Sequence, residues 1–167
     1  MIIEKALSEG KKVAIAFNDF VYLHGMNKLI GHEKTNLEVF KPIAKIYQEA
    51  MIGFHEQGKQ VFIGRYAGDS FLIIIVGEEK EEAEIIFNDL IGRERQLKRP
   101  EGAIMKPIFS HGFAYTVDME KSEFGLLIEE ADRMCEDDKR RLKDNIESRA
   151  EMFPDGNAAK FLKAISR

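Results

Sequence analysis

The order of strand-like and helix-like segments constrains the fold of this chain more than any other feature. Short apolar runs alternate with stretches whose apolar residues recur every three or four positions. In chain order the pattern predicts a strand at Val13–Phe17, a helix over Leu37–Phe54, strands at Gln60–Arg65 and Phe71–Val76, a helix over Glu79–Ile91, a strand at Pro107–Val117 and a helix over Phe124–Leu142. Pro42 inside the first of these helices predicts a kink or a later helix start. The βαββαβ core predicts an α+β fold, with a mostly antiparallel central sheet flanked by helices.

Length and composition indicate one globular domain. The chain has 167 residues, of which 44% are hydrophobic and 32% charged. We assign residues 1–147 to the folded domain and residues 148–167 to a C-terminal extension with a short helix. A net charge of −4 argues against binding to nucleic acids or anionic membranes, because both need a basic face. No apolar run is long enough to cross a bilayer, no secretory signal is recognisable and Cys135 is the single cysteine, so we expect a cytoplasmic protein.

Two aspartates are candidates for metal binding. Asp19 follows the first predicted strand, and Asp69 lies in the predicted turn between the two strands of the central hairpin. The first strand of a βαββαβ sheet lies beside that hairpin, so the two carboxylates are expected to meet there. An oxygen-lined site of this kind suits Mg²⁺ bound to nucleotide phosphates. The alternative for each aspartate alone is a purely local role at a strand end or a turn.

Four segments resemble one known family. Arg65–Phe71 (RYAGDSF) resembles the R-x-G-G-D/E-E-F hairpin of the GGDEF family of diguanylate cyclases. Upstream, the family's D-x-D-x-F-K-x-x-N-x-x-x-G-H segment is matched in spacing by Asp19, Leu23, Asn27 and Gly31-His32. Downstream, Ser110–Ala114 is similar to its S-x-G-x-A strand, and Ala131-Asp132 with Lys139 is similar to its A-D-x-x-x-x-x-x-K helix. The segments occur in the family's order, which is far more specific than a single degenerate hairpin.

The resemblance implies a nucleotidyl-cyclase, palm-like fold and a site for GTP, or for ATP, with Mg²⁺ or Mn²⁺. It implies that Asp19, Asp69 and the backbone carbonyl of Phe20 bind the metal. The implied nucleotide contacts are the backbone at Phe20, Val21 and Leu23, Gly68 in the hairpin, Asn27 and Asn36 at the base, and Lys139 and Lys143 at the phosphates. A working cyclase of this family joins two nucleotides held by two facing sites, so the resemblance also implies a homodimer.

The chain departs from the family pattern at catalytic and specificity positions. Ser70 stands where the family has a glutamate that assists metal binding and deprotonation, so we expect reduced base catalysis at this catalytic position. Val21 and Ala67 replace a second aspartate and the first hairpin glycine. Asn36 replaces an aspartate that accepts hydrogen bonds from guanine, which relaxes the predicted choice between guanine and adenine. Gly58 and Val61 occupy the places of the family's R-x-x-D feedback site.

Three functions are compatible with these residues. The first is a degenerate GGDEF domain that binds a purine nucleoside triphosphate with magnesium in a signalling or regulatory role, has weak or no cyclase activity and contacts a protein partner. The second is an active cyclase, working as a dimer and producing a diguanylate or a mixed purine dinucleotide. The third is a structural scaffold of the same fold. We rank them in this order.

Overall fold

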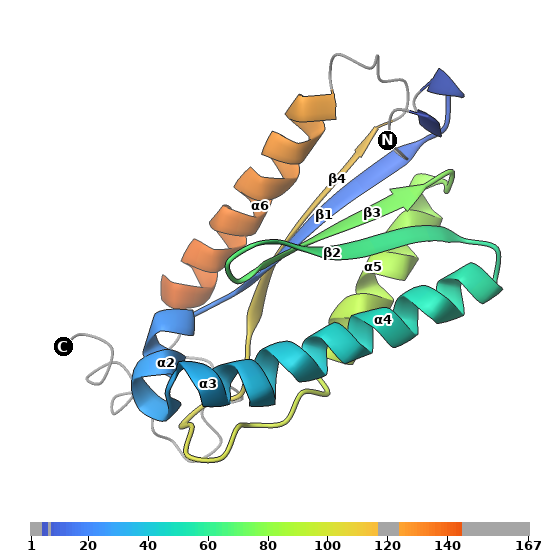
Figure 1. Cartoon of the computed structure of the whole chain (residues 1–167). Helices are drawn as coiled ribbons and strands as arrows, with labels where there is room; N and C mark the ends of the chain where they lie inside the picture. The colour runs from blue at the N-terminus through green and yellow to red at the C-terminus, as the bar shows by residue number, and fades with distance from the viewer. Residues whose placement is uncertain (1–4, 7, 117–123, 145–167) are drawn as a thin grey trace.

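The computed structural model describes residues 5–6, 8–116 and 124–144 (Figure 1). Its elements are β1 (Val13–Phe20), α2 (Leu23–Ile30), α3 (His32–Thr35), a π-helical turn (Asn36–Phe40), α4 (Lys41–Glu56), β2 (Gln60–Ala67), β3 (Ser70–Val76), α5 (Lys80–Glu94), β4 (Phe109–Thr116) and α6 (Phe124–Asp144). The predicted C-terminal extension and the last residue of the strand predicted at 107–117 lie outside the described residues. The division at residue 147 therefore stays a prediction.

The four strands form one sheet in the order β2-β3-β1-β4, and every neighbouring pair is antiparallel. Helix α6 lies on one face of the sheet, while α4 and α5 lie on the other (Figure 1). The predicted α+β architecture, with helices flanking an antiparallel sheet, is confirmed. The first strand lies beside β3 of the hairpin, as the order of elements predicted.

Strand β1 is buried on both faces because it lies inside the sheet and between two helical layers. Ala14, Ala16 and Phe20 pack in the cluster on the side of α4 and α5. Val13 and Ile15 pack in the cluster on the side of α6. Burial on both faces explains why the strand reads as a continuous apolar run and not as an alternating one. The strand is also longer than predicted, and continues through Asp19 to Phe20.

The helical region after β1 differs from the prediction in two ways. Helices α2 and α3 were not predicted. The long helix α4 spans Lys41–Glu56, and Pro42 is its second residue. A π-helical turn at 36–40 leads into it. The backbone is therefore already helical from His32 onward, and Pro42 follows a π-helical distortion within that run, so the predicted later helix start is not what the structure shows.

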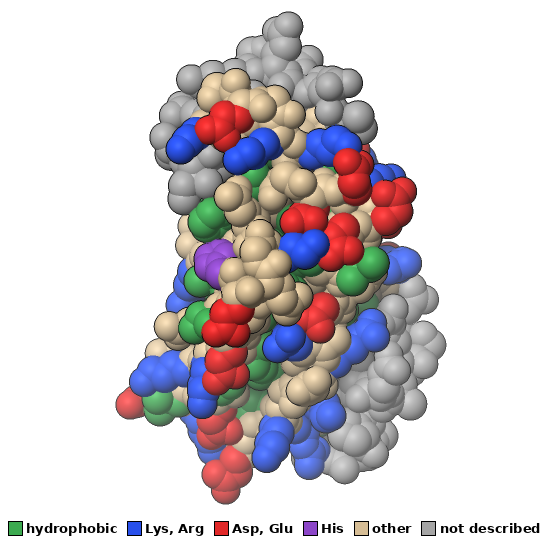
Figure 2. Space-filling model, turned by 90° about the vertical axis from the view of Figure 1, so that its right-hand side faces the viewer, with side chains coloured by type: hydrophobic (Ala, Val, Ile, Leu, Met, Phe, Trp, Pro, Cys, Tyr) green, Lys and Arg blue, Asp and Glu red, His purple; other side chains and the backbone are tan. Residues whose placement is uncertain are grey.

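The surface has no strong segregation of charge on the face shown in Figure 2. Lys and Arg side chains are interspersed with Asp and Glu side chains there, and apolar side chains form small islands between them. Some of the ion pairs of the described residues are short, such as those from Lys59 to Glu78 and Glu82, both at 2.9 Å. Among the described residues no helix is both long and apolar enough to cross a membrane.

Candidate functional site

Asp19 lies at the centre of the site. The strand register places it opposite Ser70 of β3 and Ser110 of β4, and only 6% of its surface is exposed. The Ser70 hydroxyl donates a hydrogen bond of 2.9 Å to Oδ1 of Asp19. The ammonium group of Lys139, from α6, donates to Oδ2 and forms a salt bridge with it. Both carboxylate oxygens of Asp19 therefore have a donor in the structure.

Asp69 lies beside this carboxylate in the turn between β2 and β3. Its backbone carbonyl accepts a hydrogen bond of 3.3 Å from the amide of Phe20. Burial raises the pKa of the Asp69 carboxyl, and the negative charge of Asp19 raises it further. The structure thus brings the two aspartates close enough for their charges to interact.

The hairpin turn is built without strain at Ala67. Gly68 has a φ of 52°, a left-handed conformation that glycine adopts easily, and its carbonyl accepts a hydrogen bond of 2.6 Å from Nε of Arg65. Among the described residues Tyr22 is the only non-glycine with positive φ. Alanine in place of the family's first hairpin glycine is therefore accommodated by an ordinary backbone conformation.

The two lysines of α6 contact different parts of the site. Burial acts to lower the pKa of Lys139, but its hydrogen bond with Asp19 and the Asp19 charge outweigh burial, so this pKa is raised. The ammonium of Lys143 lies 5.7 Å from the ring centroid of Tyr22, in the loop after β1. Both cations therefore border the space between the end of β1 and α6.

The loop after β1 leaves fewer amides for a ligand than the resemblance implied. The Val21 amide donates to the carbonyl of Ile108 at 2.8 Å, so it is engaged within the protein. Tyr22 has a φ of 67°, a rare conformation for an aromatic residue that stores of order 1–3 kcal/mol of strain. Leu23 begins α2, and the first amides of a helix have no acceptor within that helix.

The two asparagines expected at the base do not contact the aspartate cluster. Asn27 is half-buried in α2, and its Oδ1 is a buried acceptor without a hydrogen bond in the described part of the chain. Asn36 is exposed and lines a cavity of about 530 Å³ between α4 and the hairpin. Among the described residues no hydrogen bond or ion pair joins either side chain to Asp19 or Asp69.

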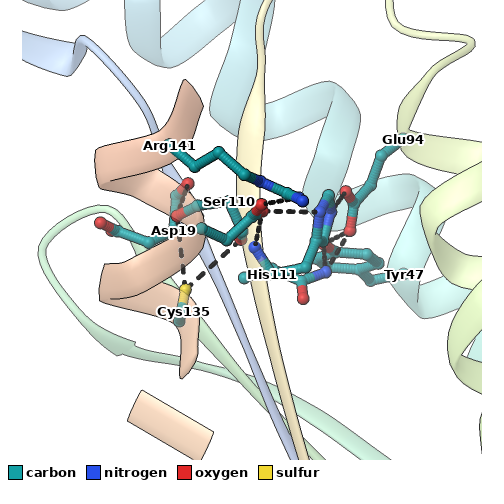
Figure 3. A network of polar contacts seen from close by, with 9 residues as sticks. Asp19, Tyr47, Glu94, Ser110, His111, Cys135 and Arg141 are labelled. Atoms are coloured by element: carbon teal, nitrogen blue, oxygen red, sulfur yellow. Dashed lines mark hydrogen bonds and ion pairs between the residues drawn. The ribbon is translucent and has the colours of Figure 1, made fainter. Parts of the chain in front are cut away.

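A buried polar network was missed by the sequence analysis (Figure 3). Glu94 of α5 is 4% exposed and accepts from the Tyr47 hydroxyl and from Nδ2 of Asn18. Its other oxygen lies 2.7 Å from Nε2 of His111. The side chains come from β1, α4, α5 and β4, and Asn18 within an apolar strand was the one signal in the sequence.

The donors at Asp19 and Asp69 fit one divalent cation that arrives with phosphates. In the described part of the chain no three or more His, Cys, Asp or Glu side chains form a metal-binding group. Two interacting carboxylates are nevertheless present, and Mg²⁺ is commonly held by one or two carboxylates together with substrate phosphates. The set is too small for a cage made by the protein alone.

Comparisons with known proteins agree with this fold. The GGDEF domain of FimX from Pseudomonas aeruginosa is 16% identical, with a TM-score of 0.67 over 83% of this chain and 82% of that one. The GGDEF domain of DgcB from Caulobacter crescentus, solved in complex with c-di-GMP, is 20% identical, with a TM-score of 0.66 over 83% and 78%. The diguanylate cyclase SiaD from Pseudomonas aeruginosa, solved with its activator SiaC, is 17% identical, with a TM-score of 0.67 over 84% of this chain and 54% of that one.

The sequence itself matches a family profile but no curated protein. The profile is described as "Diguanylate cyclase, GGDEF domain", and the match runs from residue 2 to residue 145. Because this match covers most of the 167 residues, the chain belongs to the GGDEF family.

Proposed function

We propose that this chain is a nucleotide-binding GGDEF domain with weak or no cyclase activity, acting in signalling or regulation. One observation carries the proposal. The site keeps a pair of interacting carboxylates, but Asp19 has both oxygens occupied by Ser70 and Lys139. The pair supports binding of a metal with phosphates, while these internal contacts and the serine at position 70 oppose efficient catalysis.

Nucleotide binding would use the cations and the metal together. Asp19, Asp69 and the carbonyl of Phe20 would hold Mg²⁺ or Mn²⁺, which when bound neutralises phosphate charge. Lys139 would exchange its bond to Asp19 for a phosphate oxygen, and Lys143 would act as a second point charge. The first amides of α2, at Leu23 and beyond, would add backbone donors.

The base is expected to be a purine, without a strict choice between GTP and ATP. Asn36 offers an amide, which carries one acceptor and one donor group, where a carboxylate would accept both N–H groups of guanine. The orphaned Oδ1 of Asn27 adds an acceptor that a base N–H could satisfy. Gly68 in the hairpin leaves room for close approach of a ligand to the backbone.

Weak catalysis follows from the chemistry of position 70. A serine hydroxyl is neither anionic nor basic at neutral pH, and here it donates its proton toward Asp19. Loss of general-base assistance costs about a hundred-fold or more in rate. The same position holds no negative charge for a second metal ion.

Calorimetric titration with GTP and with ATP tests the binding proposal. Wild type is expected to bind at least one of them with Mg²⁺, and Asp19→Asn with Asp69→Asn to lose most of that affinity. Asp89→Asn, at an exposed carboxylate of α5 outside the four motifs, is the matched control. Absence of binding to both nucleotides would contradict the proposal and leave the scaffold as the remaining function.

Restoring a carboxylate at position 70 tests the catalytic part. Ser70→Glu is expected to raise production of cyclic dinucleotide by about tenfold or more, because it supplies the missing base opposite Asp19. Ser70→Ala, which removes the hydroxyl without adding charge, is expected to stay inactive. Mass spectrometry of products from mixed GTP and ATP provides the measurement. An unchanged rate in Ser70→Glu, with nucleotide still bound, would show that position 70 does not limit catalysis.

An active cyclase is the second candidate, favoured by the retention of Asp19 and Asp69 side by side. Such an enzyme would dimerise to bring two sites together and would release a cyclic dinucleotide in the same assay. The neighbours solved with c-di-GMP and with an activator protein make both a cyclic dinucleotide and a protein partner reasonable ligands to add. Product formed by wild type at a rate equal to that of Ser70→Glu would favour this candidate over the first.

A further inference from the structure

A second cleft lies outside the cluster around Asp19 and Asp69. Its volume is about 480 Å³, within the range of small-molecule sites. The walls come from the C-terminal end of α5, the segment that leads into β4, and the last turns of α6. Asp19, Asp69 and Lys139 do not line it.

Three cations line this cleft from three separate segments. Arg95 follows α5, Lys106 precedes β4 and Arg141 belongs to α6. Among the described residues, Arg95 and Lys106 make no ion pair and their side chains make no hydrogen bond. Arg141 reaches across from α6 toward His111 and Glu94 (Figure 3). The cations thus converge although each belongs to a different element.

Both carboxylates of the cleft are already engaged by protein donors. Glu94 accepts from Tyr47, Asn18 and His111. Asp138 accepts from the backbone amide of His111 at 3.0 Å and from Arg141 at 2.5 Å. Three Lys or Arg side chains and two carboxylates line the cleft, an excess of one cation, in a protein whose net charge is −4.

Apolar groups complete the lining. Pro107, Phe109 and Leu142 contribute to its walls beside the three cations. A charged rim with an apolar wall matches a ligand that carries one anionic group on a less polar body. A phosphate group would take charge-assisted hydrogen bonds from the guanidinium and ammonium groups.

We propose that this cleft binds a small phosphate monoester at a site separate from the Asp19–Asp69 pair. Arg95, Lys106 and Arg141 contact the phosphate, and the wall at 107–109 contacts the organic part. This site needs no divalent cation, because the protein supplies the positive charge. That property separates it from the nucleotide site proposed above.

The test uses ¹⁵N-labelled protein in EDTA, titrated with inorganic pyrophosphate and in parallel with adenosine monophosphate. We expect saturable shifts of the amide signals of Ile108, Phe109 and His111. Tighter binding of the monophosphate would support a contact of the organic part with the apolar wall, and equal binding of the two probes would overturn that contact. No saturable shift up to about 10 mM of either probe would overturn the proposal.

Matched variants locate the binding. Lys106→Ala and Arg95→Ala are each expected to weaken it about tenfold, since each removes one charged contact. Lys98→Ala, an exposed lysine outside the cleft, is the control and should bind as wild type does. Equal losses in Lys98→Ala and Lys106→Ala would indicate nonspecific attraction and overturn the proposal.

A second arm separates the two sites. Lys139→Ala removes a cation from the Asp19 cluster and should leave binding of pyrophosphate and adenosine monophosphate in EDTA unchanged. Loss of that binding in Lys139→Ala would overturn the proposal that the cleft is their site. Titration of GTP with Mg²⁺ into Lys106→Ala tests the nucleotide site independently. The two assays therefore distinguish a cleft that does not bind phosphate from an Asp19–Asp69 site that does not bind nucleotide.

Discussion

Asp69 is half-buried in the hairpin turn, and burial together with the charge of Asp19 raises the pKa of its carboxyl. Because the folded state binds this proton more tightly than the unfolded chain does, protonation of Asp69 stabilises the fold. This contribution is fully present below the unfolded pKa of about 3.9. That contribution is lost as the pH rises through the folded pKa. The ionised carboxylate at neutral pH therefore opposes folding.

Asp69→Asn is expected to raise the melting temperature in EDTA at pH 7, because it removes a carboxylate that is repelled by Asp19. The gain should shrink as the pH is lowered to values at which Asp69 of wild type is protonated. Thermal unfolding followed by circular dichroism measures both. Asp132→Asn, at an exposed position of α6, is the control. A lower melting temperature for Asp69→Asn than for wild type at pH 7 would contradict this prediction.

Cys135 is buried between α6 and β4, and burial raises the pKa of its thiol to about 12. The thiol is therefore expected to react with a chromogenic disulfide reagent at pH 8 at least about a hundred-fold more slowly than in the unfolded chain, because the thiolate is the reactive form. Absorbance at matched reagent concentrations with and without denaturant provides the comparison. Equal rates would show that the thiol is exposed.

The same thiol predicts a stability loss at alkaline pH. Its contribution is full below an unfolded pKa of about 8.5 and is lost as the pH rises toward 12, by at most about 1.4 kcal/mol per pH unit. Cys135→Ala should show a shallower decline over this window in urea unfolding. A decline as steep as that of wild type would exclude Cys135 as its source.

At the scale of elements, α6 lies so close to β4 that only glycine fits at position 112. A Cβ added there would lie 1.9 Å from the carbonyl oxygen of Ala131 and 2.5 Å from the amide nitrogen of Cys135. Both are backbone atoms, so the whole helix would have to move. The position of Lys139 over Asp19 depends on this close approach.

Gly112→Ala is therefore expected to cost about 1–3 kcal/mol or more in the free energy of unfolding and to weaken nucleotide binding. Gly53→Ala in α4 is the matched control. Nothing lies within 4 Å of a Cβ added there, so it should stabilise the protein by roughly 0.5–1 kcal/mol. Urea unfolding measures the free energy of unfolding of both variants. A Gly112→Ala variant as stable as Gly53→Ala would show that α6 can move away from β4 at little cost.

At the scale of the whole molecule, Glu94 links the layer of α4 and α5 to the sheet. It joins Tyr47, Asn18 and His111 in one buried network, so its loss would remove an acceptor from three polar groups, of which Asn18 Nδ2 would keep its 2.8 Å bond to the Tyr47 hydroxyl. Glu94→Ala should cost about 3 kcal/mol or more, because each unsatisfied buried group costs roughly 1–3 kcal/mol. Glu84→Ala, on the same helix in an exposed pair with Lys80, should change stability by less than about 1 kcal/mol. Equal losses in the two variants would contradict a structural role for the network.

Local patterns in the sequence were enough to predict the succession of the four strands and the three long helices along the chain, because apolar periodicity is a local property. A distortion of the helix near Pro42 was also legible, since proline acts on its own turn, and the structure has a π-helical turn directly before α4. Helices α2 and α3 escaped prediction because they are short, with eight and four residues, and carry too few apolar repeats. The resemblance of four motifs indicated one family for the candidate residues.

The groups that contact Asp19 could not be predicted from local patterns. Ser70 is 51 residues away along the chain and Lys139 is 120 residues away. Strand register brings Ser70 to Asp19, and the close packing of α6 on β4 at Gly112 brings Lys139 there. The engagement of the Val21 amide by Ile108 has the same origin. A shift of one residue in register would turn Asp19 to the opposite face of the sheet, away from α6. Contacts of this kind are set by the packing of distant elements, which no local pattern encodes.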